Sequence, residues 1–289
     1  MDTPPSPDRS LPVKEVSFSN GNRAHLVAPP AGSDAAGILQ ALGIQPPTPL
    51  IIISGGAGDM TEAMAADAKL EPRLTQLFSR GIARAAADVK AVILDGGTEA
   101  GVMQLMGQGV VGQGRGVPLV GVAPAGQVTY PGGPPEGGTS GSAPLDPNHS
   151  HFVLVDSRTF GGETDTMFSL AKALVSQPAA QAADGASPAV KPATTVLVNG
   201  DPGKDSVSKA EVLHSVRHGW PVVVVEGSGG LADEIATLLK EPPAFIQDPA
   251  LAEIIADGDL HLFGPDGSAA ALRKLITRQV GRDKSRELA

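Results

Sequence analysis

The sequence predicts an α/β protein with a Rossmann-like, open, mostly parallel sheet and helices on both faces. Three observations support this prediction. Apolar runs such as Leu50–Ile53 and Val222–Val225 are continuous rather than alternating, which is typical of strands buried on both faces. The runs alternate with segments of helical periodicity, the order that right-handed β-α-β crossovers produce. Glycine clusters follow three of the runs directly, at the strand ends where open α/β sheets bind ligands.

In chain order, residues 1–12 are polar and Pro-rich and are expected to be a disordered tail, and residues 13–282 are expected to form a single domain. Strands are predicted at His25–Ala28, Leu50–Ser54, Ala91–Asp95, Pro118–Ala123, Phe152–Asp156, Thr195–Asn199, Pro221–Glu226 and Leu260–Phe263. Helices are predicted at Asp34–Leu42, Met60–Ala87 with a candidate break near Pro72, Glu99–Val111, Thr164–Val175, Ser206–His218, Leu231–Leu239 and Ala269–Val280.

Two segments interrupt this alternation. Residues 124–148 are rich in Gly, Pro and Ser and are long for a passive connection, so they form either a lid or binding loop or a disordered excursion. Residues 178–192 are rich in Ala and Pro and form either a linker between two halves or a surface insertion. We favour the insertion, because the predicted strands on either side look like members of one sheet.

Composition excludes several classes of protein. The 22 basic and 31 acidic residues give a net charge of −9, which argues against nucleic acid as a partner. Cysteine is absent, so disulfides, Cys-based metal sites and a thiol nucleophile are excluded. No apolar stretch approaches the roughly 20 residues of a membrane span, and the N-terminus has no segment of signal-peptide type. We therefore expect a soluble, cytoplasmic protein.

The three glycine turns are the main candidates for ligand binding. Glycines let the backbone approach a ligand closely, and the helix that follows adds free amides and its positive dipole end. The turns predict phosphate held on backbone amides; the alternative is that they are structural turns only. The candidate residues are Gly55, Gly56, Ala57 and Gly58 in the first turn, Gly96, Gly97, Thr98 and Glu99 in the second, and Gly227, Ser228, Gly229 and Gly230 in the third.

Two familiar nucleotide signatures do not fit. Thr61 stands where the dinucleotide fingerprint needs a third small residue, so that match fails. Lys204 is followed by Asp205 rather than Ser or Thr, and Val198 replaces the first glycine of a P-loop. Lys204 is then either a phosphate contact or a solvated loop lysine.

Other polar residues have two interpretations each. His149 and His151 form a His-x-His pair that could chelate a metal, but no third ligand is evident, so we favour hydrogen bonding at the ligand site or in the core and predict no metal. Glu226 ends a predicted strand and is expected to accept hydrogen bonds from ribose hydroxyls. Asp95, Glu99 or Glu226 could supply an acid/base carboxylate if the protein is an enzyme. We assign no catalytic residue.

Three motifs resemble a known family. Asp95–Gly107 resembles the Gly-Gly-x-x-x-Gly-Val-Met segment in the cytosolic N-terminal region of melastatin-type TRP channels. Leu145–Asp156 is similar to the Leu-Asp-x-Asn-His-Ser-His-Phe block of that region, and Val224–Asp233 is similar to its Gly-Ser-Gly segment. Order and approximate spacing agree over roughly Pro49–Leu239. The chain therefore resembles the prokaryotic LSDAT group of the SLOG superfamily.

The resemblance implies a Rossmann-like domain that binds a nucleotide-derived ligand, which is ADP-ribose in some channel relatives. It implies that all three glycine turns line the pocket, with the block 148–151 beside it. There are departures. Gly230 stands where the channels often carry Arg, and Asp95–Glu99 matches only part of the motif of the LOG phosphoribohydrolases, so that activity is not carried over.

The sequence thus predicts a sensor or signalling domain for a small-molecule nucleotide such as ADP-ribose or an NAD-related compound. No cofactor is expected besides that ligand. A protein effector and a homo-oligomer are further expected partners. The alternative is a hydrolase acting on an N-glycosidic or phosphate bond of a nucleotide, and a third reading is a scaffold whose glycine turns are structural.

Overall fold

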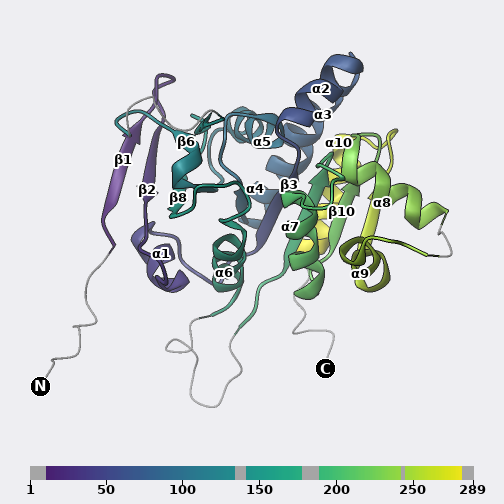
Figure 1. Cartoon of the computed structure of the whole chain (residues 1–289). Helices are drawn as coiled ribbons and strands as arrows, with labels where there is room; N and C mark the ends of the chain where they lie inside the picture. Colours follow the sequence, from purple (N-terminus) through teal and green to yellow (C-terminus); the bar gives the residue numbers. More distant parts are fainter. Residues whose placement is uncertain (1–10, 134–140, 178–188, 242–244, 282–289) are drawn as a thin grey trace, which may run out of the picture.

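A nine-stranded sheet organises the chain in the computed structural model, which describes residues 11–133, 141–177, 189–241 and 245–281 (Figure 1). Its strands, in spatial order, are β1 (Val13–Ser17), β2 (Arg23–Val27), β8 (His151–Val155), β5 (Leu119–Pro124), β4 (Val92–Asp95), β3 (Leu50–Gly55), β9 (Ala193–Val198), β10 (Val222–Val225) and β11 (Leu260–Phe263). β1 pairs antiparallel with β2, and the other pairings of this sheet among the described strands are parallel. The predicted α/β class with a mostly parallel sheet is confirmed.

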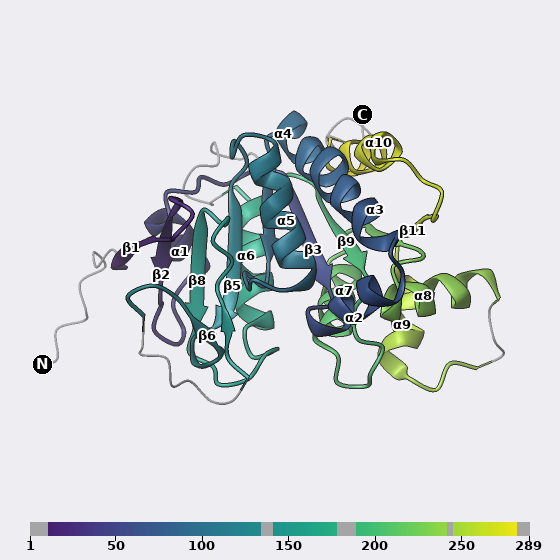
Figure 2. The same cartoon turned by 90° about the horizontal axis from the view of Figure 1, so that it is seen from above.

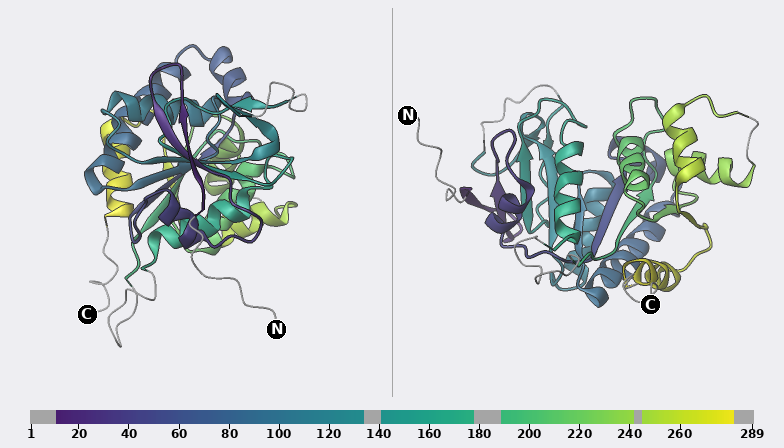
Figure 3. Two further views of the ribbon diagram at one scale, coloured as in Figure 1. Left: turned by 90° about the vertical axis from the view of Figure 1, so that its left-hand side faces the viewer. Right: turned by 90° about the horizontal axis from the view of Figure 1, so that it is seen from below.

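Helices cover both faces of the sheet (Figures 1 and 2). One face carries α2 (Gly58–Ala66), α3 (Leu70–Gln76), the π-helical segment η1 (Leu77–Ala83), α4 (Arg84–Val89), α5 (Gly101–Gly112) and α10 (Ala269–Val280). The other carries α1 (Ala35–Ala41), α6 (Thr164–Val175), α7 (Val207–Arg217), α8 (Gly230–Lys240) and α9 (Pro249–Asp257). The β1–β2 hairpin stands at one edge, and α8 and α9 lie toward the other (Figures 1 and 3).

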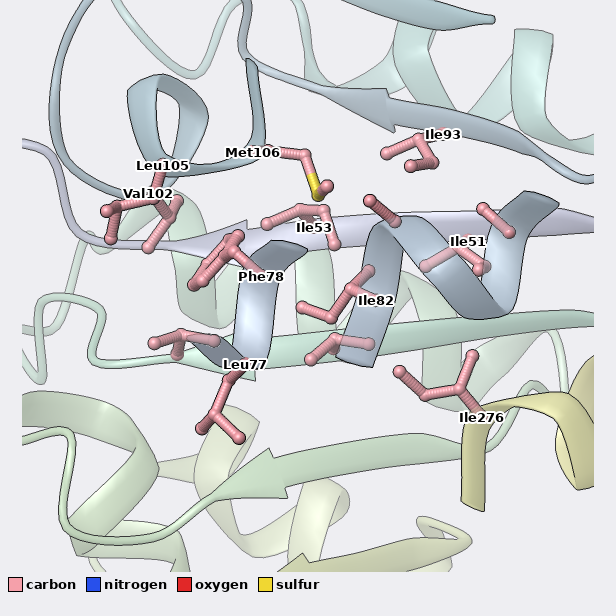
Figure 4. Packing of buried hydrophobic residues seen from close by; sticks show 14 of the residues in the cluster. Ile51, Ile53, Leu77, Phe78, Ile82, Ile93, Val102, Leu105, Met106 and Ile276 are labelled. Carbon is pink, nitrogen blue, oxygen red and sulfur yellow. The ribbon is translucent and has the colours of Figure 1, made fainter. Parts of the chain in front are cut away.

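The central strand β3 explains why its sequence is a continuous apolar run. Ile51 and Ile53 point to one core, where they pack with Phe78 and Ile82 of η1 (Figure 4). Leu50 and Ile52 belong to the core on the opposite face. All four strand residues are at most 1% exposed, because helices cover the sheet on both sides.

Several elements differ from the sequence prediction. The predicted helix Met60–Ala87 is divided: α2 ends at Ala66, before the expected break, and Pro72 is the third residue of α3, where an amide needs no helical acceptor. β1 was not predicted, because only one of its five residues is buried. α9 was also not predicted, although Asp248 caps it by accepting the amides of Ala250 and Leu251.

The two unusual segments are partly described. Segment 124–148 contains a 3-10 turn and the short pair β6 (Val128–Thr129) and β7 (Ala143–Pro144), with residues 134–140 outside the described part. At the other segment, the Gln177 amide donates to the Ala189 carbonyl oxygen, and strands of the same sheet lie on both sides. Residues 178–188 lie outside the described residues, and so do residues 1–10 of the tail predicted over residues 1–12.

No helix in the described ranges is long and apolar enough to cross a membrane.

Candidate functional site

A cavity of about 450 Å³ lies at the carboxyl ends of β3, β4 and β9. The sheet extends from β3 in two directions. On one side lie β4, β5, β8, β2 and β1, and on the other side lie β9, β10 and β11. Such a reversal of strand order opens a crevice, and ligands of open α/β sheets bind there. The volume lies within the range of small-molecule sites.

The first wall of the cavity consists of the first two glycine turns. Gly55 ends β3, Gly56 and Ala57 follow it, and Gly58 begins α2, whereas Gly96, Thr98 and Ala100 lie between β4 and α5. Neither α2 nor α5 has a side-chain cap at its N-terminus. The wall therefore combines two helix N-termini with backbone that side chains do not cover, an arrangement suited to an anion.

Close packing of these turns requires glycine. Gly101 has φ +50°, and a Cβ built on it would lie 2.1 Å from the carbonyl oxygen of Gly56. The Val102 amide donates to that same oxygen, at 3.2 Å. The two turns are thus held against each other by backbone contact.

Carboxyl groups form the opposite wall. Glu163 stands at the N-cap position of α6, Glu211 lies on α7, and Asp201 and Asp205 come from the loop after β9. Glu163 is 6% exposed and Glu211 8% exposed. Ser54 Oγ donates to Glu211 Oε2 at 2.6 Å.

Both glutamates ionise less readily than free carboxyl groups. Burial raises the pKa of Glu163. Burial also raises the pKa of Glu211 to about 8, with a lowering from the Ser54 hydrogen bond and further raising by the charges of Glu163 and Asp95. Glu211 is therefore largely protonated at neutral pH.

Sequence reasoning did not select these two glutamates. Glu163 follows a Gly-Gly pair without a strand before it, so no motif marks it. A weak signal existed for Glu211, because it shares the buried face of α7 with Ser208, Val212 and Ser215 at helical spacing. A carboxylate at a buried helical position is rare enough to indicate a site.

The cavity also has apolar surface, but no cation. Ile53, Met103, Phe160 and Val207 line it, and Phe160 is 45% exposed. None of the described residues that line it is Lys or Arg. Lys204 borders a neighbouring cavity, which shares Phe160, Asp205 and Val207 with this one.

The third glycine turn does not line this cavity. Its amides of Gly227 and Gly229 donate to the two carboxylate oxygens of Asp233, at 2.6 and 3.1 Å. Arg73 donates to the carbonyl oxygens of Glu226 and Gly227 on the same turn. The turn's polar groups are thus largely bound within the protein.

Other polar groups in this turn and next to it also form hydrogen bonds or ion pairs within the protein. Ser228 Oγ donates to the Val225 carbonyl oxygen and accepts from the Asn199 amide. The carboxylate of Glu226 pairs with Lys240. Gly230 begins α8, whose next two amides donate to the carbonyl oxygens of Gly200 and Asn199. The structure therefore brings the first two glycine turns to the cavity but not the third, although the Asn199 side chain lies against both Gly56 and Gly229.

The two histidines of the His-x-His pair have separate environments. His149 is fully buried; its Nε2 lies 2.8 Å from Asp95 Oδ1 and its Nδ1 lies 3.0 Å from Asp146 Oδ1. Burial alone would lower its pKa, but the charges and hydrogen bonds of the two aspartates raise it to about 9. His151 instead lies against His25, and burial lowers its pKa to about 4.

These contacts make the histidine block a support beneath the second glycine turn. Asp95 Oδ1, which contacts His149, also accepts the Gly97 amide at 2.8 Å. Glu99 lies on a different cavity beside Tyr130, and its amide donates to the Pro144 carbonyl oxygen. In the described part of the chain, no group of three or more His, Cys, Asp or Glu residues is placed to hold a metal ion.

Comparison with known proteins agrees with this architecture. Residues 48–263 match the family model described as SLOG in TRPM, prokaryote. Transient receptor potential cation channel subfamily M member 2 of Mus musculus is 31% identical over 222 residues, which cover 69% of this chain and 14% of the channel. The member-like 2 channel of Nematostella vectensis is 29% identical over 222 residues, covering 68% of this chain and 13% of the channel. Member 5 of Homo sapiens is 29% identical over 204 residues, covering 62% and 17%. The chain thus spans less than a fifth of the length of these channels.

Proposed function

The chain belongs to the prokaryotic family of SLOG domains related to TRPM channels, and on that premise we propose that it binds a nucleotide derivative in the cavity at the ends of β3, β4 and β9. ADP-ribose and NAD-related nucleotides are the candidates that the sequence resemblance suggests. The observation that carries the proposal is the pairing of two helix N-termini that have no side-chain cap with an opposite wall of carboxyl groups in one cavity.

The two walls suit different parts of a nucleotide. Phosphate oxygens accept hydrogen bonds only, so the amides at the N-terminus of α2, beside Gly56, suit them and the carboxyl wall repels them. Sugar hydroxyls donate hydrogen bonds and suit the carboxyl groups of Glu163 and Glu211. The exposed ring of Phe160 at the cavity lining offers a stacking surface for a base. A nucleotide bound in this orientation would need no basic side chain for its phosphates.

A screen of unfolding temperature tests the proposal. The protein is heated with ADP-ribose, NAD, ADP and AMP, each against inorganic phosphate and ribose as separate controls. A ligand at 100 times its Kd is expected to stabilise the protein by about 2.7 kcal/mol. Absence of any shift with all four nucleotides at millimolar concentration would reject nucleotide binding and favour a scaffold.

A hydrolase remains the second candidate, and one observation favours it. Glu163 and Glu211 line the cavity with raised pKa values, as general acids do. The sequence-based candidates Asp95, Glu99 and Glu226 do not line it. Prolonged incubation with each nucleotide followed by chromatography separates the two functions, since a binding domain returns the nucleotide intact.

We further propose that the domain acts in the cytoplasm and signals to a protein effector through segment 124–148. Gly141 and Ala143 of this segment line the cavity, and Ala143 belongs to β7. A bound ligand would therefore contact a segment that reaches the protein surface. Crosslinking from the 143–144 strand with and without nucleotide tests this coupling.

A further inference from the structure

The carboxyl wall contains an acceptor that lacks a partner. Glu163 is 6% exposed, lines the cavity, and its Oε2 atom has no hydrogen-bond partner among the described residues. Leaving a buried acceptor without a donor costs free energy, so such an atom is expected to find one when the cavity is filled. The wall therefore favours a ligand that brings hydrogen-bond donors.

The surroundings of Glu163 and Glu211 limit what that donor can be. No ion pair joins either glutamate to a Lys, Arg or His of the described part; the charges that act on Glu211 are those of Glu163 and Asp95, and Asp201 and Asp205 line the same cavity. Phosphate, which carries only acceptors, is disfavoured here by charge. A neutral group with two adjacent hydroxyls, each a donor and an acceptor, suits a wall in which Glu163 has an acceptor without a partner and Glu211 is held by Ser54.

We propose that Glu163 and Glu211 hold the vicinal cis-diol of a ribose, so that the cavity selects ribonucleotides over nucleotides without these hydroxyls. Glu163 accepts from one hydroxyl once its carboxyl group turns the enclosed Oε2 toward the ligand, and Glu211 contacts the other hydroxyl while Ser54 holds its Oε2. This inference rests on the proposed function, because it supplies the sugar contact of the same ligand. It also moves the ribose contact from Glu226, which pairs with Lys240, to two residues on α6 and α7.

Calorimetric titration tests the inference without any substitution. ADP and ADP-ribose are each compared with the 2′,3′-dideoxy analogue of the adenosine ribose. The ribo form is expected to bind at least about tenfold more tightly, because a site built for hydroxyls is left with unpaired groups by the analogue. Equal binding of the two forms would overturn the diol assignment and leave nucleotide binding intact. Failure of both forms to bind would overturn both proposals.

Substitutions then test the residues. Glu163→Gln and Glu211→Leu are each expected to reduce the preference for the ribo form to about threefold or less, because the first weakens one hydroxyl contact and the second removes the other. Glu253→Gln, at an exposed ion pair with Arg217, is the matched control and should keep the full preference. A preference that survives both site variants, or is lost in Glu226→Gln instead, overturns the assignment. Circular dichroism of each variant verifies folding, and the substitution-free comparison stands if a variant does not fold.

Discussion

The imidazole of His149 links two turns: its Nε2 lies 2.8 Å from Asp95 Oδ1 and its Nδ1 lies 3.0 Å from Asp146 Oδ1. Asp95 ends β4, and the same oxygen of Asp95 accepts the Gly97 amide. The buried Asp-His-Asp cluster therefore fastens the turn over residues 146–149 to the glycine turn on one wall of the cavity.

Removing the imidazole should destabilise the fold strongly. His149→Phe would leave two buried carboxylates without their shared partner, and we expect a loss of about 3–5 kcal/mol in the free energy of unfolding. Urea denaturation measures it. His261→Gln, which alters a partly exposed pair with Asp259 and a contact with Gln279, is the control and should cost less than about 1 kcal/mol. A loss for His149→Phe no larger than that of the control would contradict a charged cluster.

Stability should also fall as the solution becomes alkaline. The folded-state pKa of His149, about 9, lies above its ordinary value of 6.5, so the stabilisation is fully present below pH 6.5 and is lost as pH rises through 9. Urea unfolding at intervals from pH 6 to pH 9.5 measures this slope. His149→Gln should reduce this slope over that window and remove most of it above pH 8, and an unchanged slope in the variant would assign the effect to another group.

Glu211 should give a separate dependence at lower pH. Its folded-state pKa of about 8 exceeds the ordinary value of 4.5, so the unfolded chain releases its proton first and stability falls between pH 4.5 and 8. Glu211→Gln removes this titration and should gain stability relative to the parent protein as pH rises from 5 to 8. The same dependence of the free energy of unfolding on pH in both proteins would mean that Glu211 is ionised in the folded protein.

A carboxylate placed at Gly58 should compete with phosphate. A Cβ on Gly58 meets nothing within 4 Å, and Gly58 begins α2, whose N-terminus has no side-chain cap. Gly58→Asp is expected to stabilise the unliganded protein by about 0.3–1 kcal/mol through the helix dipole. It should weaken nucleotide binding at least about tenfold by repelling phosphate.

Gly58→Ala is the matched control for that variant, because it adds only a methyl group to open space. It should retain the affinity of the parent protein for nucleotide within about threefold. Calorimetric titration of both variants measures the difference. Full affinity in Gly58→Asp would show that phosphate does not bind at this turn.

The third glycine turn should depend on Asp233 for stability and not for ligand binding. Asp233→Ala removes the acceptor of the Gly227 and Gly229 amides and should cost about 1–2 kcal/mol in the free energy of unfolding. Nucleotide affinity should remain unchanged, since this turn does not line the cavity. Weaker nucleotide binding by a folded Asp233→Ala variant would show that the third turn takes part in the binding site.

The local sequence was sufficient to predict the parallel sheet and the positions of the glycine turns. Continuous runs such as those of β3 and β10 indicate burial on both faces wherever they occur, so the parallel sheet followed from them. β1 was not predicted, because Val16 is its single buried residue and one buried residue gives no periodic pattern of apolar residues. The segment 60–87 is divided at residues 67–69, where Asp67 Oδ1 accepts the Lys69 amide, and the helical periodicity of the segment does not show this break.

By itself, the sequence determined the α/β class, the family and the position of two turns that line the cavity, because each depends on residues close together in the chain. Only the tertiary structure decided which groups share a site. Glu163 and Glu211 come from different helices, and Asp95 meets His149 across 54 positions. It also showed that Asp233 occupies the third glycine turn. The burial and charge of these residues depend on groups from distant parts of the chain, which come close only when the sheet forms. No local sequence pattern can therefore specify them.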